Sequence, residues 1–95
     1  MRARKNFVVV AYDVSDDRRR RRIVKILEKI GVRVNYSVFE CMLTDAQYEK
    51  LRAEIGRKIK PREDSVVYYP ICVDCYTKIV YQPPLRRTYE PVFVV

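Results

Sequence analysis

An almost continuous apolar run, residues 7–12, leads directly into Asp13 and a set of helix-capping residues. Such a run is typical of a central β-strand that is covered on both faces. The caps are Ser15, Asp16 and Asp17, whose oxygens and negative charge suit the first turn of a helix. Apolar residues then recur at offsets of three, four and seven, which predicts one buried helical stripe. The stripe consists of Ile23, Ile26, Leu27 and Ile30.

The next part of the chain repeats the strand and helix patterns. We expect Gly31 to end the first helix as a left-handed cap. Residues 32–43 alternate as a strand, but the alternation slips by one near Val38, which predicts either a bulge or a break into two strands. Thr44 and Gln47 match a capping box and open a second helix.

Three further segments carry strand patterns. Residues 65–72 and 76–82 are expected to be strands, and Pro70 places one of them at a sheet edge. Residues 91–95 resume an apolar strand that needs a partner edge, and the edge of a second subunit would supply one. We therefore expect a homodimer.

These elements predict an α+β fold of the ferredoxin-like sandwich type, with a mainly antiparallel sheet and two helices on one face. Residues 1–82 would form this domain. Residues 83–95 would form a C-terminal extension whose terminal strand pairs across the dimer.

The charge of the chain indicates a polyanionic partner. Twenty Lys and Arg against twelve Asp and Glu leave a formal charge of +8, and a small domain this basic is expected to bind nucleic acid. The sequence has no membrane-span pattern and no signal-peptide pattern, so we expect a cytoplasmic protein that does not bind membranes. The absence of histidine excludes Ser-His-Asp and Cys-His nucleophile arrangements.

The three cysteines are too few for a disulfide framework or a four-sulfur zinc site within one chain. Cys72 and Cys75 have a redox-like spacing between two strand patterns. We expect them to flank a hairpin turn, with a local disulfide as an alternative in an oxidising or thermophilic setting.

Asp13 and the arginines that follow it are the candidate functional residues. Asp13 ends a central strand, where α/β-type sheets often place reactive groups, although it could also serve only as a turn cap. At 100° per residue, Arg19 and Arg20 flank the apolar stripe, whereas Arg18, Arg21 and Arg22 point away from it and could follow phosphates. The alternative is a surface helix whose charges only pair with nearby carboxylates.

Two segments together resemble the CRISPR-associated Cas2 family. The first runs from Tyr12 through Asp17 into the arginines, and the second runs from Gly31 to Glu40 and on to Leu43 and Thr44. The resemblance implies a ferredoxin-like homodimer in which two copies of Asp13 face each other across the twofold axis and hold one divalent cation. The positions that match the family's functional residues are Tyr12, Asp13, Arg20, Arg22, Arg33, Ser37 and Phe39.

The resemblance leaves two functions open. The first is a metal-dependent endonuclease that takes part in spacer acquisition, in which Asp13 binds Mg²⁺ or Mn²⁺. Arg20, Arg22 and Arg33 would then hold the phosphate, with Arg18, Arg19 and Arg21 adding to nucleic-acid binding. The second is a non-catalytic dimeric scaffold that binds DNA and the Cas1 integrase. The sequence does not decide between RNA and duplex DNA as the substrate.

Overall fold

The computed structural model describes residues 4–84 and shows a four-stranded antiparallel sheet with helices. The elements in chain order are β1 (Lys5–Asp13), α1 (Asp17–Glu28), β2 (Gly31–Asn35), β3 (Val38–Thr44), α2 (Asp45–Gly56), β4 (Ser65–Ile71) and α3 (Val73–Tyr76). The strand order is β2-β3-β1-β4, so β1 is central and β4 lies at an edge. Pro70 is therefore in an edge strand, as the sequence predicts.

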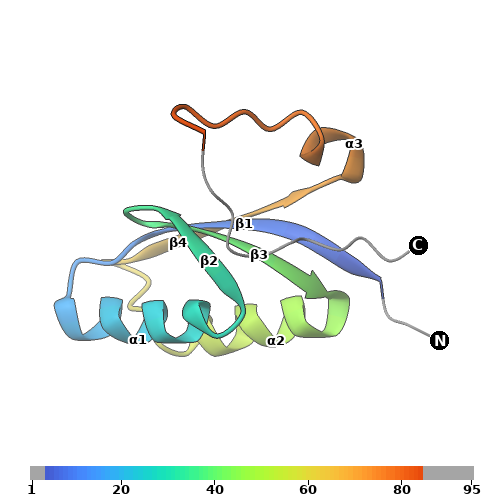
Figure 1. The fold of residues 1–95 in the computed structure, drawn as a ribbon. Helices are drawn as coiled ribbons and strands as arrows, with labels where there is room; N and C mark the ends of the chain where they lie inside the picture. The colour runs from blue at the N-terminus through green and yellow to red at the C-terminus, as the bar shows by residue number, and fades with distance from the viewer. Residues whose placement is uncertain (1–3, 85–95) are drawn as a thin grey trace.

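The sheet has one covered face and one more open face. In Figure 1, α1 and α2 lie side by side against one face, while α3 and the segment after it lie over the other. The ferredoxin-like arrangement is thus confirmed. The core between the sheet and the two helices includes Val8, Val10 and Tyr12 of β1 with Ile23 and Leu27 of α1. Successive strand residues point to opposite faces, which assigns Val9, Ala11 and Asp13 to the open face.

Local capping explains where both long helices begin. The Asp16 side chain accepts a hydrogen bond from the backbone N–H of Arg19 at 2.9 Å, which fixes the start of α1. The predicted capping box is present at α2. The Thr44 hydroxyl accepts the backbone N–H of Gln47 at 3.1 Å, and the Gln47 side chain accepts the backbone N–H of Thr44 at 2.8 Å.

The expected slip in alternation is a break into two strands. Residues 36 and 37 form the turn between β2 and β3, and the register shifts between Arg33 and Asn35. The prediction for Gly31 was wrong, because no described glycine has a positive φ and the cap of α1 is Lys29 in a right-handed conformation. Gly31 instead begins β2 opposite Cys41.

Gly31 is required by a close approach between strands. A Cβ at this position would lie 2.5 Å from Cys41 Sγ and 2.7 Å from the backbone oxygen of Glu40. We expect Gly31→Ala to lower the free energy of unfolding by about 1–3 kcal/mol, as overpacked sites do. Gly56→Ala is the matched control, because its Cβ would meet nothing within 4 Å. Urea denaturation of both variants tests this, and equal stabilities would contradict it.

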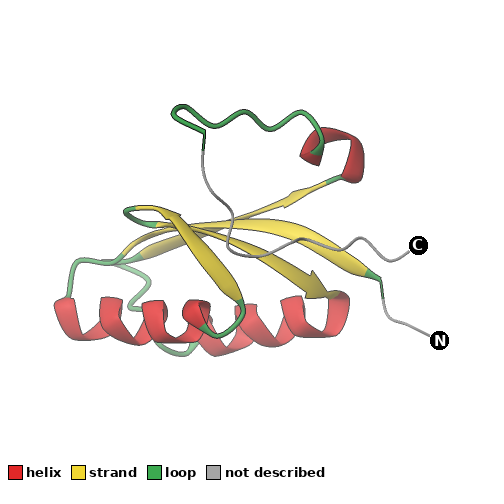
Figure 2. Cartoon of the chain, in the orientation of Figure 1, coloured by secondary structure: helices red, strands yellow, loops and turns green. Residues whose placement is uncertain are grey.

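The strand expected over residues 76–82 was also wrong. The chain forms the short helix α3 and then an irregular segment, drawn red and green in Figure 2. The Tyr76 ring packs edge-on against Phe7 with 4.7 Å between ring centroids, and the Tyr81 hydroxyl donates a hydrogen bond to Glu40. Tyr76 and Tyr81 of this segment thus lie against a sheet face, and the segment does not extend a sheet edge, while Val80 stays exposed. The expected strand at residues 91–95 lies outside the described residues.

Candidate functional site

Asp13 is the last residue of β1, and its side chain is exposed. It pairs across the sheet with Ser65, the first residue of β4. Among residues 4–84, no side chain or backbone group forms a hydrogen bond or an ion pair with its carboxylate. This carboxylate therefore remains available for a ligand at the end of the central strand.

Tyr12 faces the opposite side of the sheet, toward α1. Arg33 Nη2 donates a hydrogen bond to the Tyr12 hydroxyl at 2.9 Å, and this hydroxyl donates to the backbone oxygen of Tyr36 at 3.4 Å. The backbone N–H of Tyr12 donates to the backbone oxygen of Ser37 at 3.0 Å. The hydrogen bond to Tyr12 raises the pKa of Arg33, which is charged throughout the physiological range.

Phe39 lies beneath Arg33 and is 1% exposed. The Arg33 guanidinium carbon is 5.5 Å from the centroid of the Phe39 ring, a cation–π distance. The rings of Tyr12 and Phe39 are 6.2 Å apart. Phe39 thus supports the position of Arg33 from within the core, and its ring is not available to contact a substrate.

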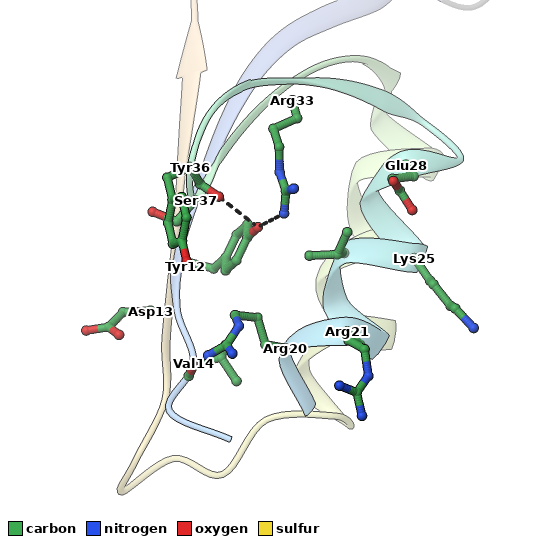
Figure 3. Close-up of a pocket in the computed structure, with 11 residues that line it drawn as sticks. Tyr12, Asp13, Val14, Arg20, Arg21, Lys25, Glu28, Arg33, Tyr36 and Ser37 are labelled. Atoms are coloured by element: carbon green, nitrogen blue, oxygen red, sulfur yellow. Dashed lines mark hydrogen bonds between the residues drawn. The ribbon is translucent and has the colours of Figure 1, made fainter. Parts of the chain in front are cut away.

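A groove of about 700 Å³ separates this cluster from α1 (Figure 3). Arg20 enters it from α1, donating from Nη1 to the backbone oxygen of Val14 at 2.9 Å and pairing with Asp17. Arg21, Lys25 and Glu28 line the groove from the same helix. Cations outnumber carboxylates along it, so it favours an anionic ligand.

Three arginines of α1 form an exposed basic face. Arg18, Arg21 and Arg22 are exposed and form no ion pair with any residue from 4 to 84. The helical-wheel prediction that these three point away from the apolar stripe is confirmed. Among the five arginines, only Arg20 pairs with a carboxylate of its own helix. Lys25 lies four residues after Arg21 and extends this face one helical turn further. Residues four apart share one face of a helix, so this spacing in the sequence indicates the position of Lys25.

Arg19 has a different environment from the other arginines. Its side chain is 13% exposed and pairs with Asp64, whose side chain is fully buried, with Nε 2.8 Å from Oδ2. Asp64 also accepts the backbone N–H groups of Lys60 at 2.8 Å and Ser15 at 3.3 Å. The Arg19 hydrogen bonds, followed by that of Lys60, lower the pKa of Asp64 to about 2. This geometry favours a structural role for Arg19, and no sequence signal pointed to Asp64.

The expected site residues therefore fall into two groups at one end of the sheet. Tyr12, Arg20, Arg33 and Ser37 line the groove on the helix side. Asp13 also borders the groove, but in Figure 3 its carboxylate points away from the other side chains. Arg22 lies on the exposed face of α1 and is not part of the groove lining.

A single chain offers little for metal binding. Within residues 4–84 there is no group of three or more His, Cys, Asp or Glu side chains that could together hold an ion. None of the helices in this part of the chain has the length and apolar composition needed to span a bilayer.

Comparison with known proteins places the chain among small CRISPR-associated proteins. Residues 6–79 match the family described as CRISPR associated protein Cas2. A relative from Synechocystis sp., named CRISPR-associated endoribonuclease Cas2 3, is 38% identical over 88 residues, which cover 90% of this chain and 96% of the relative.

Two solved structures share the fold. Streptococcus pyogenes Cas2 superimposes with a TM-score of 0.71 at 28% identity, covering 79% of this chain and 96% of that one. A chain of a partial Cas6-RT-Cas1–Cas2 complex superimposes with a TM-score of 0.70 at 28% identity, covering 80% of this chain and 89% of that one. The likeness thus extends over most of each compared chain.

Proposed function

This chain belongs to the CRISPR-associated protein Cas2 family, and from that premise we propose that it is a metal-dependent nuclease acting on RNA. The observation that carries the proposal is the exposed Asp13 carboxylate, which has no partner within residues 4–84 and ends the central strand beside a cationic groove. The name of the Synechocystis relative, an endoribonuclease, supports RNA as the substrate class. Participation in spacer acquisition follows as the role of such a protein in a CRISPR system.

The open face of the sheet supports a homodimer. Val67 and Tyr69 of β4 are 43% and 52% exposed on this face, beside Val9 and Ala11 of β1. A second copy docked there would remove these apolar groups from water. Because Asp13 shares this face, a twofold axis through it would bring two Asp13 carboxylates together. Sedimentation that gives a monomer at micromolar concentration would remove the dimer from the proposal.

The residues on this face fit a hard divalent cation. Mg²⁺ takes oxygen ligands and needs only one or two carboxylates, which the Asp13 pair of a dimer would supply. When bound there, Mg²⁺ or Mn²⁺ would supply a lower pKa for an attacking water and polarisation of a phosphodiester. The contribution of this chain is to present an exposed carboxylate on a rigid central strand.

The cationic groups would position the substrate. Arg33, held by Tyr12 and supported by Phe39, has its guanidinium fixed before binding, so little side-chain entropy is lost when it contacts a phosphate. Arg20 adds a second charge in the groove. Asp13 and these arginines lie on different faces at the same end of β1, so a polynucleotide passing around that end could contact both groups.

The exposed basic face of α1 would carry the sequence-independent part of binding. We expect the combined Arg18→Ala, Arg21→Ala and Arg22→Ala variant to weaken nucleic-acid binding and to make the slope of log affinity against log salt shallower by about 2, because fewer counterions are released. Fluorescence anisotropy over a salt series measures this slope. A control variant that loses Lys50, Arg57 and Lys58, which are exposed on or after α2, removes the same charge. Equal changes in both variants would contradict a specific role for α1.

Cleavage assays test the proposed activity directly. Purified protein is incubated with labelled single-stranded RNA or duplex DNA, in Mg²⁺ or with a chelator. We expect RNA to be cut only when the cation is present. Cleavage of duplex DNA alone would change the substrate class, and RNA cleavage that survives chelation would exclude the metal-dependent mechanism.

A second candidate role is a non-catalytic dimeric scaffold for Cas1. It is favoured by the likeness to a chain in a partial Cas6-RT-Cas1–Cas2 complex, together with the basic face of α1. In this role the protein binds duplex DNA and Cas1, and loss of the Asp13 carboxylate leaves assembly and spacer integration unchanged. Removal of residues 91–95 would disrupt assembly if the terminal strand contributes to it.

A further inference from the structure

Two exposed thiols lie together at the end of β4. Cys72 follows the last residue of this strand, and the backbone N–H of Cys75 donates a hydrogen bond to Cys72 Sγ at 3.3 Å. The backbone N–H of Tyr76 donates to the backbone oxygen of Cys72 at 2.8 Å, so the two cysteines bracket one closed helical turn. Both cysteines are free and exposed. The expectation that they flank a hairpin turn was wrong, since they bracket the first turn of α3.

We propose that Cys72 and Cys75 form a redox-active dithiol that exchanges with low-molecular-weight disulfides. The proposal rests on the position of the two cysteines in one helical turn, with Cys72 as the N-cap of α3 and its Sγ 3.3 Å from the backbone nitrogen of Cys75. This contact brings the Cys72 sulfur to the backbone of Cys75, as a disulfide between neighbouring turns of chain requires. The proposal goes beyond nucleic-acid cleavage, in which neither thiol takes part.

The surroundings of the two sulfurs assign different roles to them. The backbone N–H of Cys75, followed by the thiol of Cys75, lowers the pKa of Cys72. The hydrogen bond to Cys72 raises the pKa of Cys75. Since the thiolate is the nucleophile in disulfide exchange, Cys72 attacks first and Cys75 resolves the intermediate.

The reaction balances in two steps. The Cys72 thiolate attacks one sulfur of the small disulfide, forms a mixed disulfide and releases one thiolate. Cys75 then gives up its proton and attacks the Cys72 sulfur, which forms the intramolecular disulfide and releases the second small thiolate. The protein loses two electrons and two protons, and one molecule of small disulfide becomes two molecules of thiol.

Cys41 provides an internal contrast. It is buried in the core, and burial raises its pKa to about 12, which suppresses its thiolate at neutral pH. Of the three cysteines, only the pair at α3 is therefore open to exchange.

The dithiol is separate from the candidate nuclease site. Asp13 pairs with Ser65 at the start of β4, whereas Cys72 follows its end, which places the two sites about 20 Å apart along the strand. The thiols instead lie at the base of the segment in which Tyr76 packs on Phe7. A disulfide there would fix the point where the chain leaves β4 to cross the open sheet face (Figure 1).

The test uses the folded full chain with oxidised glutathione as the probe. Thiols are counted by alkylation and intact mass before and after treatment, and again after reduction with dithiothreitol. We expect wild type to lose two of its three thiols with no glutathione attached, and to recover both on reduction. We expect Cys75→Ser to accumulate one stable glutathione adduct on Cys72, and Cys41→Ser to behave like wild type.

Several results would overturn the proposal. They are a wild-type protein that keeps three free thiols, one that accumulates glutathione adducts, and a disulfide that includes Cys41. The Asp13→Asn variant should oxidise as wild type does, so failure of the dithiol and failure of the nuclease proposal are distinguished. The Cys72→Ser variant keeps an oxygen that can accept the hydrogen bond from the Cys75 N–H, so the turn stays capped. It lacks the attacking sulfur, so it should form no intramolecular disulfide, which separates redox chemistry from capping of the turn.

Discussion

Asp13→Asn is expected to reduce cation-dependent RNA cleavage by at least about a hundredfold, while nucleic-acid binding stays within about twofold of wild type. The amide keeps the size of the side chain but removes the negative charge that would hold the cation. Lost metal assistance is worth several kcal/mol of barrier, and each 1.36 kcal/mol is tenfold in rate. Initial rates with single-stranded RNA in Mg²⁺, paired with anisotropy measurements of binding, give both quantities.

Asp74→Asn is the matched control for this experiment. Asp74 is also an exposed carboxylate, but it lies in α3 and pairs with Lys78 at 3.0 Å, far along the chain from Asp13. We expect this control to cleave as wild type does. Full cleavage by Asp13→Asn would exclude Asp13 as the metal ligand, and unchanged spacer integration by this variant would favour the scaffold role.

Asp64→Ala is expected to lower the melting temperature by on the order of 10–20 °C. The substitution leaves the Arg19 guanidinium mostly buried without its carboxylate, and leaves the backbone N–H groups of Lys60 and Ser15 without their acceptor. Thermal unfolding followed by circular dichroism measures the shift. Glu63→Gln is the control, because Glu63 is half exposed and its nearest contact with Arg19 is 3.5 Å. Equal shifts in both variants would contradict the burial argument.

The same contact predicts the response to acid. The folded-state pKa of Asp64 is about 2, below its ordinary value of 3.8. Its contribution to stability is therefore complete above about pH 4 and is lost as the pH falls toward 2. We expect the difference in melting temperature between wild type and Asp64→Ala to narrow across this range. A difference that stays constant from pH 5 to pH 2 would show that the carboxylate is not held in its charged form.

Much of the fold could be predicted because it depends on local patterns. The apolar run of β1, the Asp16 cap of α1 and the Thr44 capping box of α2 each act within a few residues. The helical period likewise separated the exposed arginines from the two that lie against the protein. The side chains of Tyr12 and Asp13 point to opposite faces because successive residues of a strand alternate between its two faces. This direction could be predicted from the sequence, although both residues match functional positions of the same family.

Long-range contacts account for what the sequence analysis did not predict. Nothing near Arg19 indicated its partner Asp64, which lies 45 residues away and is buried only because the loop before β4 folds back onto α1. Gly31 looked like a helix cap, but its requirement comes from the approach of Cys41 on the neighbouring strand. The apolar pattern after residue 75 matched a strand, but the segment is not a strand and its Tyr76 packs against Phe7.

By itself, the sequence determined the α+β class, the N-terminal caps of α1 and α2, the basic face of α1 and the family, because each depends on residues close together in the chain. Only the tertiary structure decided which arginine is structural, which side of the sheet presents Asp13 and where Cys72 and Cys75 meet. The physical reason is that these outcomes depend on which groups share a buried space, and distant segments define that space only once they have packed together.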